Sequence, residues 1–215
     1  MIVGPTQCGK SYLAAELLAN KDKVFNPVPQ KVLWFYALWQ PLYDELREKG
    51  LVDRFIEGID DYQSYLTKDE STGNYQPSII VIDDLQREVH KMADMFERGS
   101  HHENATLIFI SQNVFHQGKN FRDVSLNTHY MFVFKNNRDS SQIQNLGRQV
   151  YPQNSRFVSE AYEIACQKPH GYLMFDFHPG SVPELKVRAD IFNPDGCTIF
   201  MPKRKHGFIH NNHTQ

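Results

Sequence analysis

Cysteine and long apolar runs are both scarce in this chain of 215 residues. The three cysteines, Cys8, Cys166 and Cys197, form no Cys-x-x-Cys pair, so the sequence supports neither a disulfide framework nor a cysteine zinc site. Apolar runs such as Ile79–Ile82 are far shorter than the roughly 20 residues of a membrane-spanning helix. The start, Met-Ile-Val-Gly-Pro, lacks the basic and long apolar regions of a signal peptide. We therefore expect an intracellular protein that has no membrane partner.

An excess of charge is also missing, because 23 basic and 25 acidic residues give a net charge of −2. This near-balance excludes a histone-like protein but leaves room for a local nucleic-acid patch. Residues 1–100 carry 11 basic and 16 acidic side chains, whereas residues 101–215 carry 12 and 9. We therefore expect a polyanion to contact mainly the second half.

What is present is a globular composition, with 40% hydrophobic and 22% charged residues. The length fits one main domain, which we place at residues 1–200, followed by a basic, histidine-containing flexible tail at 201–215. The opening strand, Met1–Val3, is only three residues long, which is compatible with a truncated N-terminus.

Short apolar stretches alternate with helical patterns along the chain. The sequence predicts further strands at 31–36, 79–82, 106–111, 130–134 and 172–177, and helices at 11–19, 42–49, 86–96, 139–149 and 155–166. This alternation favours an α/β three-layer sandwich with a mainly parallel central sheet. In sequence, the strand at 31–36 lies between the glycine-rich turn at residues 4–11 and Asp83, which are described below. This order suits P-loop proteins that carry an additional strand between the two corresponding strands.

A glycine-rich turn joins the first strand to the first helix. It reads Gly4-Pro5-Thr6-Gln7-Cys8-Gly9-Lys10-Ser11 and fits the P-loop pattern G-x-x-x-x-G-K-[ST]. Backbone amides of such a turn and the following helix N-terminus cradle phosphates. Lys10 is then expected to reach the β- and γ-phosphates of ATP, and the Ser11 hydroxyl to ligate Mg²⁺. The alternative is a chance match in an ordinary glycine-rich turn.

Polar residues follow two of the buried strands. Asp83 ends an aliphatic run and is a candidate to hold Mg²⁺ through water, and Asp84 is the candidate catalytic base. Gln112 follows the strand at 106–111, so it should reach the carboxyl edge of the sheet, sense the γ-phosphate and align water. The alternatives are a pair of acids that cap the next helix and a glutamine that only completes a turn.

The ordered set of motifs is more specific than the P-loop alone. GPTQCGKS, VLWFYALWQPLYDEL, IIVIDDL, FERGSHHEN and SQNVFHQGKNFRDVSLNTHYMFVFKNNRD occur in this order. The set resembles the viral genome-packaging ATPases of the FtsK–HerA superfamily, over roughly residues 4 to 177. The resemblance is greatest to those of Polinton/Maverick elements, adintovirus-like viruses and virophages, which are relatives of the poxvirus packaging ATPase.

The resemblance implies ATP-driven movement of double-stranded DNA into a viral capsid by a homo-oligomeric ring, in the host cytoplasm or nucleus. It assigns Lys10 and Ser11 to nucleotide and Mg²⁺, Asp83 and Asp84 to the metal and catalytic pair, and Gln112 to the sensor. Many superfamily members outside the viral branch have Asp-Glu at the second motif, where this chain has Asp-Asp. The shorter carboxylate of Asp84 reaches less far, which weakens its assignment as the base.

A ring ATPase usually needs an arginine that neutralises transition-state charge across a subunit interface. The candidates are Arg138, Arg148 and Arg98. We favour Arg138 because it follows the strand at 130–134 and so emerges at the nucleotide edge, while Arg98 should lie at the opposite edge. The alternative for Arg138 is a structural salt bridge.

DNA contacts are expected from Lys119, Arg122, Lys135 and the tail segment Lys203–Lys205. Contact with the phosphate backbone, without reading of bases, suits a motor that slides over any sequence. The alternative is a solvated loop and tail without a ligand.

Three other functions stay open. A P-loop nucleoside or nucleotide kinase would have an arginine-rich lid and no water-positioning acid after Asp83. A GTPase is disfavoured. The stretch Asn20–Lys23 superficially resembles the guanine-specifying pattern N-K-x-D, but it follows the P-loop helix too early and has lysine where the pattern has aspartate. A non-catalytic nucleotide-binding protein of the same fold is the third.

Overall fold

The computed structural model describes residues 1–59, 61–85, 88, 95, 103–113 and 124–203. The strands are β1 Ile2–Val3, β2 Lys31–Tyr36, β3 Arg54–Glu57, β4 Ser78–Asp83, β5 Ala105–Ser111, β6 Tyr130–Phe134, β7 Tyr172–Asp176, β8 Val187–Ala189 and β9 Thr198–Ile199. The α-helices are α1 Lys10–Ala19, α2 Lys21–Val24, α3 Pro41–Glu48, α7 Ser141–Val150 and α8 Ser155–Ala165, with 3₁₀ turns at Tyr62–Tyr65 and Pro183–Leu185.

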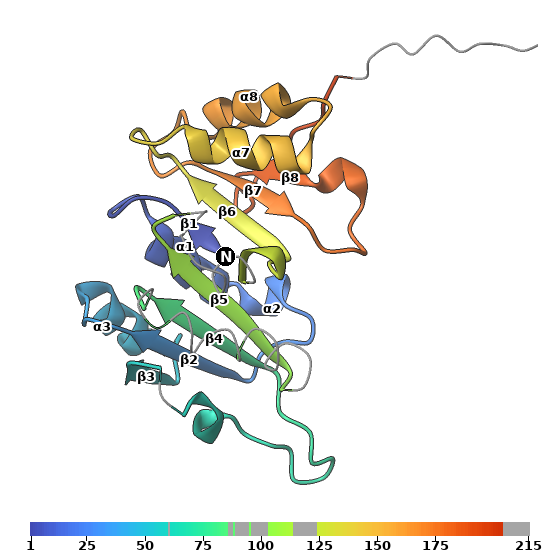
Figure 1. Cartoon of the computed structure of the whole chain (residues 1–215). Coiled ribbons are helices and arrows are strands. Elements are labelled where there is room, and N and C mark those ends of the chain that lie inside the picture. The colour runs from blue at the N-terminus through green and yellow to red at the C-terminus, as the bar shows by residue number, and fades with distance from the viewer. Residues whose placement is uncertain (60, 86–87, 89–94, 96–102, 114–123, 204–215) are drawn as a thin grey trace, which may run out of the picture.

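Within the described residues, one nine-stranded sheet has the order β3-β2-β4-β5-β1-β6-β7-β8-β9 (Figure 1). The strands from β3 to β6 are parallel, and β7, β8 and β9 extend the sheet in antiparallel fashion. This confirms the predicted mainly parallel sheet. The strand between β1 and β4 in space is β5, whereas β2, which lies between them in sequence, pairs with the other side of β4.

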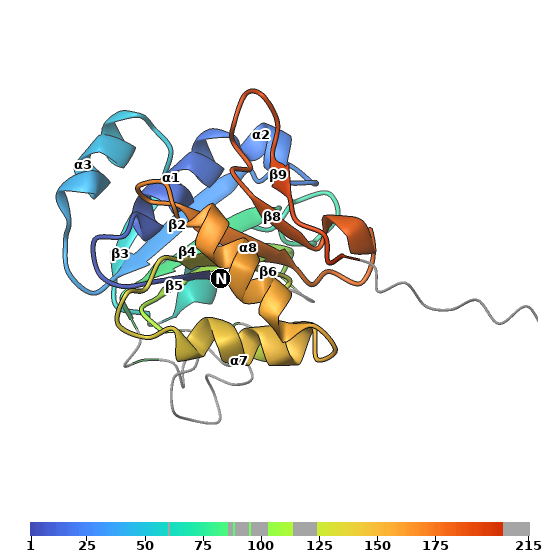
Figure 2. The same cartoon turned by 90° about the horizontal axis from the view of Figure 1, so that it is seen from above.

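Helices cover both faces of the sheet, which makes the three layers visible in Figure 2. The alternation along β4 explains the arrangement, because successive side chains of a strand point to opposite faces. Ile79 and Val81 pack in one core cluster with apolar residues of α1 and α3. Ile80 and Ile82 pack in the other with apolar residues of α7 and α8. A strand buried on both faces therefore reads as an unbroken aliphatic run.

The register brings the ends of the four central parallel strands to one edge. Val3 of β1 is opposite Ser111 of β5 on one side and Val133 of β6 on the other. Asp83 of β4 is opposite Ile110 of β5. Ligands of open α/β sheets bind at this carboxyl edge, so the edge is where the site should be sought.

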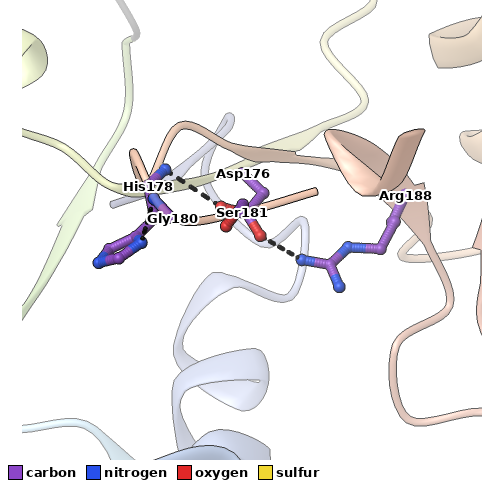
Figure 3. Close-up of polar contacts among 5 residues, drawn as sticks. All are labelled: Asp176, His178, Gly180, Ser181 and Arg188. Atoms are coloured by element: carbon purple, nitrogen blue, oxygen red, sulfur yellow. Dashed lines mark hydrogen bonds and ion pairs between the residues drawn. The ribbon is translucent and has the colours of Figure 1, made fainter. Parts of the chain in front are cut away.

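A buried ion pair joins β7 to β8 beyond the parallel strands (Figure 3). Arg188 Nη2 donates to Asp176 Oδ2 at 2.7 Å, and Ser181 Oγ donates to Asp176 Oδ1 at 2.7 Å. The backbone N–H of His178 donates to the same Oδ1 at 3.1 Å. Three donors thus satisfy a carboxylate that is only 7% exposed, and the cluster fixes the antiparallel end of the sheet.

The sequence did not predict β3, β8 or β9, which are short and owe their extended form to pairing with neighbours. The helix predicted at 86–96 falls mostly outside the described residues, as does the tail beyond Lys203. The two later helices begin at Ser141 and Ser155. They lie within two residues of the predicted bounds.

Candidate active site

The turn between β1 and α1 is closely packed around its two glycines. A Cβ placed on Gly4 would lie 2.6 Å from the Cβ of Phe134 and 2.7 Å from the Sγ of Cys8, so a side chain there does not fit. Gly9 has φ +107°, a conformation that L side chains rarely adopt, and Gln7 is also left-handed at φ 63°. The Gly4 N–H donates to the Ser111 carbonyl at 3.2 Å, which ties the turn to β5.

The lysine of this turn lies within its own loop. Lys10 Nζ donates to the carbonyls of Gly4 and Pro5 at 2.9 and 2.8 Å. Gly9 is the N-cap of α1, and as it has no side chain it leaves the first amides of the helix without a side-chain cap. A cation and a helix N-terminus therefore act on the same point, which suits an anion such as a phosphate.

Asp83 joins the loop to β4. It is 3% exposed, and its Oδ2 accepts hydrogen bonds from Ser11 Oγ at 2.9 Å and from Tyr43 OH at 3.0 Å. Burial raises the pKa of Asp83, while the two hydroxyl donors act in the opposite direction and lower it. Burial, and then the negative charge of Asp83, also raises the pKa of Tyr43, so the phenol stays neutral and donates.

Oxygen atoms of Ser11 and Asp83 form a donor set that fits Mg²⁺, which prefers carboxylate and hydroxyl oxygens beside phosphate. The hydroxyls of Ser11 and Tyr43 both donate their hydrogen bonds to Oδ2 of Asp83, which leaves Oδ1 for a metal-bound water. A cation here would also offset the cost of burying the carboxylate. Among the described residues, no group of three or more histidine, cysteine or acidic side chains is arranged as a metal site of its own.

Asp84 and Gln112 meet at the same edge. Asp84 is exposed and has φ 58°, which turns the chain away from β4 directly after Asp83. Gln112 Nε2 donates to Asp84 Oδ1 at 3.5 Å, across the gap between the β4 and β5 ends. The structure thus brings the P-loop, both aspartates and the glutamine together, as the sequence predicted.

Within the described residues, the hydrogen bonds of the candidate arginines do not reach the P-loop, Asp83 or Asp84. Arg138 is exposed in the loop after β6, where its backbone N–H donates to Asn136 Oδ1 at 3.0 Å. Within the described part of the chain it forms no ion pair, so the predicted alternative of a structural salt bridge finds no partner there. Arg148 is exposed on α7 and its Nη1 donates to Asn145 Oδ1 at 2.9 Å. Arg98 lies outside the described residues.

Of the predicted DNA contacts, Lys119, Arg122 and the tail beyond Lys203 also lie outside the described residues. Lys135 is exposed at the carboxyl end of β6, on the same edge as the P-loop. Its side chain lines a cavity that reaches Cys8.

That cavity is a feature that sequence reasoning missed. It has a volume of about 330 Å³ and lies between the P-loop, the end of β6 and the turn before β7. His170 in this turn holds the loop, because its Nδ1 lies 3.0 Å from the Cys8 carbonyl. The cavity is on the β6 side of the P-loop, whereas Asp83 is on the β4 side.

Two buried tyrosines were also missed as site residues. Tyr43 contacts Asp83, and Tyr162 OH donates to the Phe134 carbonyl and accepts from the Asn136 N–H, both at 2.8 Å. Their apolar spacing on α3 and α8 indicates core residues and gives no signal for the hydroxyl contacts. Only the tertiary structure shows where those hydroxyls point.

No protein-family model matches the sequence, and no curated protein matches it. Solved structures do. The genome-packaging NTPase B204 of Sulfolobus turreted icosahedral virus 2, in complex with AMPPCP, aligns with a TM-score of 0.51 and 14% identity, over 94% of this chain and 95% of that one. ATPases 2 and 3 of EssC from Geobacillus thermodenitrificans align with a TM-score of 0.52 and 14% identity, over 96% of this chain but only 40% of that one.

Across the described residues, none of the helices is long and apolar enough to span a bilayer. The mainly parallel sheet, the P-loop at its carboxyl edge and the alignment over nearly all of both chains agree with one another. This chain therefore has the P-loop NTPase fold of the viral genome-packaging NTPase B204 and of the EssC ATPases, which is the fold that its resemblance to FtsK–HerA packaging ATPases implies.

Proposed function

We propose that this chain hydrolyses ATP and uses the energy to move double-stranded DNA into a viral capsid, as one subunit of a homo-oligomeric ring. The observation that carries the proposal is the hydrogen bond of 2.9 Å between Ser11 and Asp83. It joins the phosphate loop to a buried carboxylate at the edge where such folds bind nucleotides. The ordered motifs and the fold of the packaging NTPase support the DNA and capsid partners.

In this proposal the P-loop amides and the N-terminus of α1 hold the β- and γ-phosphates of ATP, and Lys10 exchanges its carbonyl partners for phosphate oxygens. Ser11 and Asp83 hold Mg²⁺, which when bound neutralises charge on the phosphates. Asp84 accepts a proton from the attacking water, and Gln112, which reaches Asp84, orients that water. Arg138 of a neighbouring copy stabilises charge in the transition state.

The position of the proposed magnesium site determines how we orient the nucleotide along the edge of the sheet. Because Ser11 and Asp83 lie toward β4, the terminal phosphate should face that side and the nucleoside should leave toward β6. We propose that the cavity of about 330 Å³ beside Cys8 and His170 receives it. Lys135 lines this cavity and is exposed at the same edge, where we expect it to contact the nucleotide or the DNA backbone.

The test is ATP turnover with and without duplex DNA at two salt concentrations. We expect DNA to stimulate turnover and salt to weaken the stimulation, since contacts with the phosphate backbone release counterions. Lys10→Ala should abolish turnover, while Lys23→Ala, which removes an exposed lysine from α2, should leave it unchanged. Unchanged hydrolysis in Lys10→Ala would contradict the proposal. Transfer of phosphate to a nucleoside, without any response to DNA, would instead identify a kinase.

A further inference from the structure

Tyr43 lies within the stretch VLWFYALWQPLYDEL, to which the sequence assigned no chemical role, and its hydroxyl donates a hydrogen bond to the carboxylate of Asp83. It comes from α3, 40 positions before Asp83 in sequence, and its side chain is fully buried. Its hydroxyl donates to Oδ2 at 3.0 Å, the oxygen that also accepts from Ser11 at 2.9 Å. Two donors on one oxygen fix the rotation of the carboxylate, so its other oxygen has a defined direction.

An aromatic cluster holds the phenol in place. The Tyr43 ring contacts Trp34, Tyr36, Trp39 and Phe55, with centroids 5.4 to 5.5 Å apart. Phe55 stacks on it with an interplanar angle of 28°, and the other rings are tilted or perpendicular to it. Since β2 pairs directly with β4, this cluster lies against the strand that delivers Asp83. The hydroxyl therefore cannot leave the carboxylate without repacking of the cluster.

We infer that Tyr43 is a positioning residue for the magnesium site, which it serves by orienting Asp83. The inference rests on the proposed ATPase function. Ser11 alone would not fix Asp83 in this role, because its hydroxyl oxygen would also be a ligand of the metal. Groups that orient a metal-binding carboxylate typically contribute 10- to 100-fold in metal affinity. We expect Tyr43 to contribute within this range.

Tyr43→Phe removes the hydroxyl and retains the ring, so the cluster stays packed. Mn²⁺ serves as the probe, and its binding to the protein–ATPγS complex is measured by electron paramagnetic resonance. We expect binding 10- to 100-fold weaker than in the wild type, with ATPγS affinity in EDTA within twofold. We also expect hydrolysis to need more Mg²⁺ and to recover when Mg²⁺ is raised. A purely structural defect would not be rescued in this way.

Tyr36→Phe is the matched control, because Tyr36 belongs to the same cluster and contacts the Tyr43 ring. It should leave Mn²⁺ binding within twofold of the wild type. Equal Mn²⁺ binding in Tyr43→Phe and the wild type would overturn the inference, and so would equal losses in the two variants. If the wild type itself binds no Mn²⁺ with ATPγS, the proposed function fails, which is a different outcome from either of these.

Discussion

The hydroxyl of Tyr162 offers a test of how the nucleotide edge is held together. It bridges the Phe134 carbonyl and the Asn136 N–H at 2.8 Å each, at the point where β6 ends and the loop to Arg138 begins. Tyr162→Phe deletes both bonds and keeps the ring. Each net hydrogen bond is worth about 0.5–1.5 kcal/mol, so we expect a loss of about 2 kcal/mol in the free energy of unfolding. For a chain of this size that corresponds to a fall of about 4–8 °C in Tm.

Urea unfolding at constant pH measures the change, which should appear in the midpoint with an unchanged m-value. Tyr151→Phe is the control, because within the described residues the Tyr151 hydroxyl has no hydrogen bond and its ring packs on Phe157. The control should change stability by less than about 0.5 kcal/mol. Equal effects of the two variants, or no effect of Tyr162→Phe, would refute the bridging role. Because Tyr162 also fixes the start of the loop to Arg138, its variant should lose turnover while it still binds ATPγS.

Three further predictions concern other parts of the molecule. Arg188→Ala leaves the buried carboxylate of Asp176 without its cation and should lower the free energy of unfolding in urea by about 3 kcal/mol. As a control, Arg156→Ala breaks the exposed pair with Glu160 and should change that free energy by about 0.5 kcal/mol or less. His170→Ala removes the contact with the Cys8 carbonyl that holds the P-loop, so it should weaken the binding of both ATP and tripolyphosphate in calorimetry; unchanged affinity for tripolyphosphate would contradict that role. Burial raises the pKa of Cys166 to about 12, so at pH 8 iodoacetamide should spare it and modify the exposed Cys197, as mass spectrometry can show.

The sheet was predictable where single strands carry their own signal. The stretches at 31–36 and 130–134 coincide with β2 and β6, since each is an apolar, aromatic run of strand length. Strand order was not readable in the same way. That β5 lies between β1 and β4 depends on crossover connections, and a two-residue strand such as β9 is defined only by its partner.

The functional site also combines features that the sequence predicted with features that it did not. The P-loop is local, so its spacing predicted the turn that holds Lys10 and Ser11. The contact of Ser11 with Asp83 followed only when the carboxyl ends of the parallel strands were placed at one edge of the sheet. The roles of Tyr43 and His170 depend on contacts between residues 40 and 162 positions apart. No periodic pattern encodes such a contact, because the same tyrosine or histidine would look identical in a core or on a surface.

The aromatic cluster around Tyr43 has an optical consequence. Trp34 and Trp39 are the two tryptophans of the whole sequence, and both rings touch Tyr43, at 5.4 and 5.5 Å between centroids. Almost all intrinsic ultraviolet emission of the protein therefore originates one side chain away from Asp83. Titrating unlabelled protein with nucleotide and divalent cation in a fluorimeter should thus report events at that carboxylate, with no engineered dye.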